Sequence, residues 1–400
     1  MRKLGDIASA AKVIDTCRSL DLQDRYLNNK ATKYLLRADE VTQAMDTIAM
    51  FTKHDGDPQY TLFELQVSWY ELELADSYTR QKKYGLALKN FYAVQKHFAI
   101  YDDDQFDFHG YCMRKTTLRA YIDLLNMEDN LYAHKFYQRA LRGAVSIMLS
   151  LEDRKAGASD GAADNDQDGA DLSHLPPAER KKEKARLRKL RKKQEEQEEA
   201  KRLALEAEAK EKAKEKGEGR GGNIVAPKDE DPKGEKLIEK ATLDEAASWC
   251  SRVQRLRGCH SDTHAVIADV MIRRQKYVAA LKNVVSGLSK TPNHPECTTM
   301  LVKLAIAFSS SSTDNPLVHS IVDAELRDVM GGNIDVNRFV MEYVEKSKSL
   351  GLMHRIGAAK SLAMIGGDFF LFVTTPILCS PTNLICLIFH TSSKVMRVSF

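Results

Sequence analysis

The stretch LADSYTRQKKYGLALK, residues 74–89, decides the fold. With the residue that follows two positions later, it places large apolar, small, aromatic, small and aromatic side chains in turn: Leu74, Ala75, Tyr78, Ala87 and Phe91. This spacing predicts two antiparallel helices that cross where the alanines let their axes approach, with the aromatic rings filling the space beside the crossing. Tyr84-Gly85 is expected at the tight turn between the two helices.

The same pattern recurs along the chain. In IADVMIRRQKYVAALKNV the segment RRQKYVAALKN echoes RQKKYGLALKN, and the five positions are Ile267, Ala268, Met271, Ala280 and Val284, followed by Pro292 where such repeats usually carry proline. A weaker upstream copy consists of Ala31, Leu35, Ala44 and Ile48. One helix pair cannot bury its apolar face alone, so three copies predict an all-α fold. We expect a tetratricopeptide-type helical-repeat solenoid, a right-handed superhelix interrupted by a charged low-complexity linker. The alternative is an ordinary helical bundle with coincidental spacing.

The composition is that of a folded protein with moderate charge. Hydrophobic residues make up 43% of the 400 residues, which is enough for a sizeable core, and the net charge of +4 carries little information. Seven cysteines without CxxC spacing argue against a disulfide framework and predict reduced thiols. We therefore expect a cytoplasmic protein, with the nucleus as a further location. The N-terminal stretch has no apolar core of signal-peptide length and looks like the inside of a helical array.

Composition also divides the chain into segments. Residues 1–151 and 237–365 are expected to form helical repeats. Residues 152–236 contain almost no large apolar side chains, so no core can offset the entropy of ordering them. We expect this segment to be a charged linker, either disordered or a single solvated helix. Residues 366–400 form an atypical apolar tail that is not expected to belong to the fold.

The apolar tail raises one alternative. Its segment FFLFVTTPILCSPTNLICLIFH, residues 369–390, is apolar enough to suggest a membrane helix. Pro376 and Pro381 argue against it, because each proline breaks a helix interior. The interpretation kept here is therefore a protein without a membrane contact.

The stretch 102–125 contains the residue types of a chemical site. Its run of three aspartates predicts a helix start, and the apolar spacing beyond it predicts an amphipathic helix. Asp104, Asp107 and His109 suggest a metal site, and Cys112 beside His109 suggests a thiol–imidazole pair. Capping and packing explain these residues better, because a metal site needs three or four convergent ligands and no third catalytic group is evident. No GxxxxGK[ST] phosphate loop is present.

Two basic clusters predict anion binding, against the alternative of an ordinary solvated face. Residues 180–193 carry ten basic residues and one acid, without aromatic residues to stack bases. This density predicts a sequence-independent nucleic-acid contact or an import signal. The residues assigned to it are Lys181, Lys182, Arg186, Arg188, Lys189, Arg191, Lys192 and Lys193. The second cluster predicts a polyanion pocket if the solenoid brings its members together, and consists of Lys30, Lys33, Arg80, Lys82, Lys83 and Lys89, with Arg37 nearby.

Several stretches resemble one known family in the same order. They are LDLQDRYLNNKATKYLLRADEVTQAM, SWYELELADSYTRQKKYGLALKNFYAVQKHF, DDQFDFHGYCMRKTTLRAYIDLL, LRKLRKKQ, THAVIADVMIRRQKYVAALKNVV, NHPECTTMLVKL and HRIGAAKSLAM. Together they resemble the auxiliary subunit of the N-terminal acetyltransferase A (NatA) complex, from Met1 to about Ala363. The chain is similar to a later part of that family's longer array, and residues from about 366 onward match nothing in it.

The resemblance implies a non-catalytic scaffold. Members of the family wrap a superhelix around a GNAT-fold catalytic subunit, which transfers acetyl from acetyl-CoA to nascent-chain N-termini near the ribosome. They hold inositol hexakisphosphate at the interface with that subunit, which suits Lys30, Lys33, Arg80, Lys82, Lys83 and Lys89. A small chaperone-like regulatory subunit is a further implied partner. The chain itself has no [QR]xxGx[GA] acetyl-CoA loop, so we expect no catalysis by it.

Two other hypotheses remain open at this point. A generic repeat adaptor would bind peptides or proteins in a concave groove without a stable enzyme partner. An enzyme using His109 and Cys112 is the least favoured hypothesis, because no orienting group accompanies them.

Overall fold

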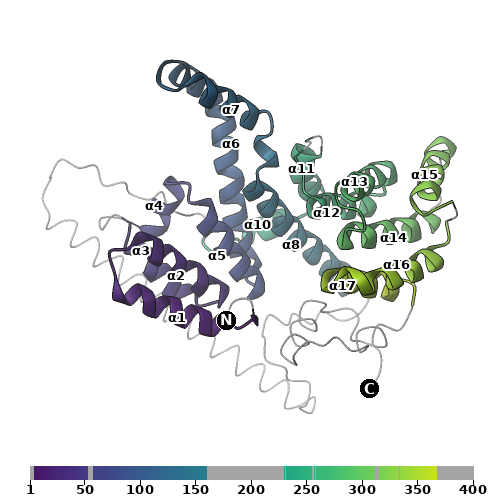
Figure 1. Ribbon diagram of the computed structural model, residues 1–400, viewed down its shortest axis with the longest axis horizontal. Coiled ribbons are helices and arrows are strands. Elements are labelled where there is room, and N and C mark those ends of the chain that lie inside the picture. The colour runs from purple at the N-terminus through teal and green to yellow at the C-terminus, as the bar shows by residue number, and fades with distance from the viewer. Residues whose placement is uncertain are drawn as a thin grey trace, which may run out of the picture. The chain divides into compact units, whose positions relative to one another are not determined.

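The computed structural model describes residues 4–52, 57–159, 229, 231–254, 256, 258–310, 315–332 and 334–366, and every regular element in these ranges is a helix (Figure 1). The elements are α1 (Ile7–Leu20), α2 (Arg25–Arg37), α3 (Val41–Ala49), α4 (Pro58–Glu64), α5 (Ser68–Arg80), α6 (Tyr84–Lys115), α7 (Leu118–Glu128), the 3-10 turn η2 (Leu131–Ala133), α8 (Lys135–Ser159), α10 (Glu235–Lys240), α11 (Leu243–Val253), α12 (Ser261–Arg273), α13 (Tyr277–Lys290), α14 (Pro295–Ser309), α15 (Pro316–Val329), α16 (Val336–Leu350) and α17 (Leu352–Met364). The all-α prediction is confirmed.

Three helix pairs carry the repeated pattern, and their predicted core positions are buried. In α5 and α6 Ala75, Ala87 and Phe91 have no exposed surface, and Leu74 and Tyr78 are 3% and 8% exposed. The equivalent positions in α12–α13 and in α2–α3 are buried as well. The helical-repeat prediction is therefore confirmed from its packing, and the coincidental-spacing alternative is not supported.

The three turns share one backbone conformation. Asp39, Lys82 and Gln275 occupy equivalent positions and all have positive φ, at 65°, 60° and 57°. In each turn the next residue's N–H donates to a carbonyl five residues earlier, as Lys83 does to Tyr78 at 2.9 Å. This is the hydrogen bond that ends a helix through a left-handed residue. The tight turn of the central pair therefore lies at residues 81–83, and the prediction that Tyr84-Gly85 forms it is wrong.

Gly85 does not form the turn; it allows another backbone segment to approach α6 closely. It lies in the first turn of α6, and a Cβ there would collide with the backbone carbonyl of Lys233. Gly234 approaches the same place from the other side with φ of 72°, where a Cβ would collide with Gly85. Glycine is needed at both positions because two backbones touch. The chain before α10 is thus packed directly on the start of α6.

The long helix α6 corrects another expectation. Asp102, Asp103 and Asp104 do not open a helix but lie within α6, which continues to Lys115. These acids are on the surface, and Asp102 accepts a hydrogen bond from the hydroxyl of Tyr132 at 3.2 Å. The predicted helix 104–125 is instead divided at Thr116 and Thr117. Thr117 caps α7 by accepting from the N–H of Ala120, which is a favoured role for threonine.

Helices α14, α16 and α17 pack together at the end of the described chain. Val302, Val340, Tyr343, Val344 and Ala358 form their shared apolar cluster. α8 continues to Ser159 and α10 begins at Glu235, and the linker and tail predicted between and beyond the repeats fall largely outside the described residues. Among described residues, no helix combines the length and apolarity that crossing a bilayer requires.

Candidate functional site

The turn between α2 and α3 contacts the end of α5, and this contact positions Arg80. The turn residue Asp39 between α2 and α3 accepts hydrogen bonds from Ser77 at 2.7 Å and from Arg80 at 2.8 Å. Arg80 also donates to the carbonyl of Leu36 at 2.8 Å, which is an acceptor at the end of α2. One repeat therefore caps the preceding one through Arg80, and this guanidinium is already paired.

Three cations from two helices converge on one buried carboxylate. Lys33 and Arg37 of α2 and Arg139 of α8 lie 3.4, 2.9 and 3.3 Å from Glu73 of α5, whose side chain is only 3% exposed. We call these four residues the Glu73 cluster. Arg37 binds both carboxylate oxygens, at 2.9 and 3.0 Å, in the bidentate geometry that favours strong ion pairs.

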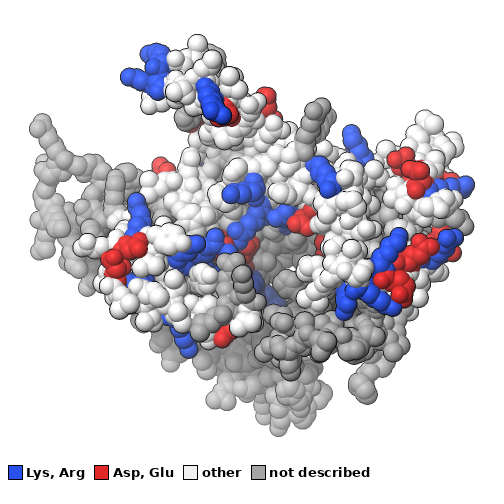
Figure 2. All heavy atoms as spheres, in the orientation of Figure 1, with Lys and Arg blue, Asp and Glu red and all other residues white. Residues whose placement is uncertain are grey.

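The environment of Glu73 favours its charged form. Burial by itself would raise the pKa of this carboxyl, but the hydrogen bond from Arg37 and the charges of Arg139, Arg37 and Lys33 lower it below the ordinary value. Arg139 also pairs with Asp76, so three cations meet two anions and one positive charge remains (3 − 2 = +1). Figure 2 shows lysine and arginine side chains gathered on the face where Figure 1 draws α5 and α8.

The other predicted polyanion residues do not pair with Glu73. Lys30 lies over the ring of Tyr26, 5.2 Å from its centroid, and Lys89 of α6 pairs with Asp229. Lys82 and Lys83 are exposed in the α5–α6 turn. Arg37 joins Lys33, as their spacing suggested, whereas Arg139 was missed. No local signal marks Arg139, because its partners are more than sixty residues away in sequence.

The eight basic residues predicted to contact nucleic acid, from Lys181 to Lys193, lie outside the described residues. They remain a prediction from sequence.

His109 and Cys112 do not form a pair in the structure. The Nδ1 of His109 lies 3.1 Å from the hydroxyl of Tyr121, and its Nε2 lies 3.3 Å from Glu128, so the imidazole joins α6 to α7. Cys112 is buried, 7% exposed. Asp104 and Asp107 are on the surface, and no group of three potential metal ligands occurs among the described residues. Packing is the role this geometry supports.

α7 presents an apolar stripe that the rest of the described chain leaves uncovered. Leu118, Ile122 and Leu125 are 74%, 47% and 36% exposed, and their spacing places them on one face of the helix. Figure 1 shows α7 at the far end of α6, away from α5. We call these three residues the α7 stripe. An exposed apolar face of this kind is typical of a surface that binds a protein partner.

Comparisons with known proteins agree on one family. A family model described as "N-terminal acetyltransferase A, auxiliary subunit" matches residues 1–286. The N-terminal acetyltransferase A complex auxiliary subunit NAA15 of Arabidopsis thaliana is 40% identical over 316 residues, 78% of this chain and 33% of that protein. The N-alpha-acetyltransferase 16, NatA auxiliary subunit of Mus musculus is 37% identical over 362 residues, 90% of this chain and 41% of the mouse protein.

A solved structure shows the same fold. The structure of Naa15/Naa10 bound to HypK-THB matches with a TM-score of 0.59 and 28% identity, covering 82% of this chain and 39% of the matched chain. This chain therefore spans well under half the length of the relatives it matches.

Proposed function

Because this chain belongs to the family of auxiliary subunits of N-terminal acetyltransferase A, we propose that it is a non-catalytic helical scaffold that binds and positions a catalytic acetyltransferase subunit. The observation that carries the proposal is the family match over residues 1–286, which spans the Glu73 cluster and the α7 stripe. The structural relative is itself a complex of Naa15 with Naa10. A scaffold of this kind changes catalysis only through contacts that favour one state of the enzyme.

The α7 stripe is the surface we assign to the catalytic subunit. Its apolar residues lie within the family match and are not covered by other described parts of the chain. Co-expression with a Naa10-type subunit, followed by affinity purification, is expected to recover a complex. Leu118→Asp with Ile122→Asp should weaken that complex at least about tenfold, because charge would be buried against apolar surface.

A matched control is available on another helix. Leu317 and Ile321 of α15 have the same spacing and are 65% and 47% exposed, close to the values for Leu118 and Ile122. Leu317→Asp with Ile321→Asp should leave the complex intact. Equal loss in both double variants would remove the α7 assignment, and no complex with the unaltered chain would remove the scaffold proposal.

The basic residues of the first half support a second part of the proposal. We assign inositol hexakisphosphate, or a similar polyanion, to the surface around the Glu73 cluster at the interface with the catalytic subunit. The excess positive charge and the exposed Lys82 and Lys83 support this. Lys82→Glu with Lys83→Glu should weaken calorimetric binding to the complex about tenfold. Lys276→Glu, at the equivalent turn of α12–α13, is the control that should leave affinity unchanged.

The stretch 180–193 supports a ribosome contact in the cytoplasm, with nuclear import as its other use. Replacing Lys181, Lys182, Lys192 and Lys193 by Gln should reduce co-sedimentation with ribosomes, and added salt should reduce it for the unaltered chain, since phosphate contacts release counterions. Undiminished co-sedimentation of the variant would contradict this part alone. A small regulatory chain, as HypK is in the solved relative, is a further partner we propose.

A further inference from the structure

The break between α6 and α7 carries a sequence pattern that the surfaces assigned above do not use. Residues 114–117 read Arg-Lys-Thr-Thr. An arginine followed by a basic residue, any residue and then a serine or threonine occurs once in the 400 residues. Protein kinases with an acidic substrate groove select this charge pattern ahead of the hydroxyl that they phosphorylate. The pattern therefore indicates Thr117 as a phosphate acceptor.

The segment is accessible to another protein. Arg114, Lys115 and Thr117 are exposed, and Figure 2 shows basic side chains at the tip where Figure 1 draws α7. Arg114 donates to the carbonyl of Gly110 at 3.0 Å, and neither basic residue pairs with an acidic side chain among the described residues. Thr116 and Thr117 already have extended backbones, with ψ of 164° and 152°. Only the last turn of α6 has to unwind to present the segment to a kinase, and helix ends open at little cost.

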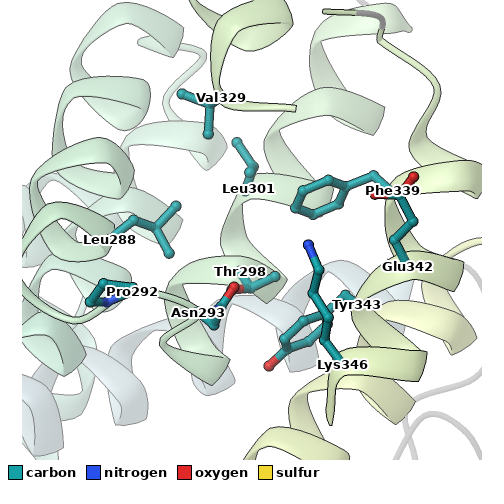
Figure 3. A pocket seen from close by; sticks show the side chains of 10 residues that line it. All are labelled: Leu288, Pro292, Asn293, Thr298, Leu301, Val329, Phe339, Glu342, Tyr343 and Lys346. Atoms are coloured by element: carbon teal, nitrogen blue, oxygen red, sulfur yellow. The ribbon is translucent and has the colours of Figure 1, made fainter. Parts of the chain in front are cut away.

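A second pair of neighbouring threonines shows how Thr117 differs from a structural threonine. Thr298 and Thr299 are 3% and 1% exposed, and each hydroxyl donates to the carbonyl four residues earlier at 2.9 Å. Figure 3 shows Thr298 among the side chains that line a cavity of about 290 Å³ between α13, α14, α15 and α16. Thr116 donates in the same way, at 2.7 Å. The hydroxyl oxygen of Thr117 instead accepts from the N–H of Ala120 at 3.3 Å, and no described residue accepts its proton.

We propose that a protein kinase selective for basic substrates phosphorylates Thr117, and that the phosphate weakens the docking of the catalytic subunit on the α7 stripe. The hydroxyl oxygen of Thr117 attacks the γ-phosphorus of ATP. The bond from that phosphorus to the bridging oxygen breaks, ADP leaves, and the hydroxyl proton passes to an aspartate of the kinase. The effect on docking rests on the proposed scaffold function, whereas the modification itself does not.

The position of Thr117 explains the effect on docking. A phosphate there brings a charge of about −2 to the residue directly before Leu118, the first residue of the α7 stripe. A partner that covers Leu118 has to remove water from this charge, which weakens the association. The helix itself is expected to persist, because phosphate oxygens can accept from the N–H of Ala120 as the hydroxyl does, and negative charge is favourable at a helix N-terminus. Phosphorylation therefore changes the charge of the surface and keeps the fold.

The first experiment tests the modification without the acetyltransferase. The full chain is incubated with ATP and the catalytic subunit of cyclic-AMP-dependent protein kinase, and mass spectrometry should locate a phosphate on Thr117. Thr117→Asn should remove it while keeping a side chain that caps α7. Arg114→Ala should lower the initial rate at least about tenfold, because a charge-assisted contact with the kinase is lost. Arg119→Ala is the matched control, since Arg119 is exposed but follows the acceptor, and it should leave the rate unchanged.

The second experiment measures affinity for a Naa10-type subunit. The phosphorylated chain should bind about tenfold more weakly than the untreated chain, and phosphatase treatment should restore binding. Thr117→Asn treated with kinase and ATP should bind as the untreated chain does.

Each part of the proposal can fail separately. No phosphate on Thr117, or equal rates for Arg114→Ala and Arg119→Ala, would overturn the site. Equal affinity of the phosphorylated and untreated chains would overturn the effect on docking. If the untreated chain binds no catalytic subunit, the scaffold proposal fails together with the effect on docking, and the first experiment still decides whether Thr117 is the acceptor.

Discussion

The two halves of α6 belong to one helix and have different surroundings. In the first half Ala87, Phe91 and Val94 have no exposed surface, whereas in the second half Tyr111 and Met113 are 58% and 71% exposed. Both halves have apolar residues at helical spacing. The difference is in what they pack against among the described residues. The first half contacts α5 and α8, through His97 and Phe91, and the second contacts α7 and η2, through His109 and Asp102. Similar sequence thus stabilises the fold in one half and remains available to a partner in the other.

The largest expected effect tests this difference directly. Phe91→Ala removes a fully buried ring that lies against Gly143 of α8, and should lower the free energy of unfolding by about 3–5 kcal/mol. Met113→Ala in the exposed half should change it by no more than about 0.5 kcal/mol. Urea unfolding followed by circular dichroism measures both. Similar changes in the free energy of unfolding for the two variants would contradict the difference between the two halves.

Removing the charge of Glu73, on the helix α5 that packs against the first half of α6, should give the next largest effect. Glu73 faces three cations, and Glu73→Gln should cost about 2 kcal/mol at pH 7, because three partly buried cations lose their counter-charge. Since the folded pKa of Glu73 is below the unfolded value, its stabilisation is present above the unfolded pKa of about 4.3 and is lost as pH falls. Unfolding from pH 3 to 7 should therefore show a flatter acid limb for the variant.

The pKa of Glu71, on the same helix, is shifted in the opposite direction. Burial raises its pKa, against the effect of His97 at 2.7 Å, so its charged form costs stability and this cost disappears as pH falls through the raised pKa. Glu71→Gln should remove that opposite slope and should not flatten the acid limb. The same acid limb in the two variants would contradict the assignment of opposite shifts.

The smallest effects come from two glycines in α6. Gly85→Ala should destabilise by about 1–2 kcal/mol, because its Cβ would meet the backbone of Lys233. Gly110→Ala, in the exposed half, meets nothing within 4 Å and should stabilise by about 0.5–1 kcal/mol through helix propensity. Thermal unfolding of the two variants gives the sign of each change. The same sign in both would show that the halves are more alike than their burial suggests.

The sequence predicts the repeats well because their positions repeat a packing rule. Leu74, Ala75 and Phe91 are identified by spacing alone, and the buried equivalents in α12 and α13 follow from the same rule. The helix break was harder to predict. The run Asp102–Asp104 resembles a helix start, but nothing interrupts α6 before Thr116, so local capping chemistry was overruled by an uninterrupted helix.

The candidate sites depend on contacts that sequence spacing does not contain. Lys33 and Arg37 are one turn apart, and their shared face is evident from the sequence. Arg139 and Glu73 meet only because α8 packs beside α5. Tertiary packing decides which of many lysines and arginines act together.

The unbroken length of α6 has a mechanical consequence. Thirty-two residues at 1.5 Å each make a helix about 48 Å long, which packs against α5 near one end and against α7 near the other. A partner that displaces α7 would also tilt α6, and the resulting force would act on the packing of Phe91. Binding of another protein at α7 would therefore affect the core of the repeats through α6.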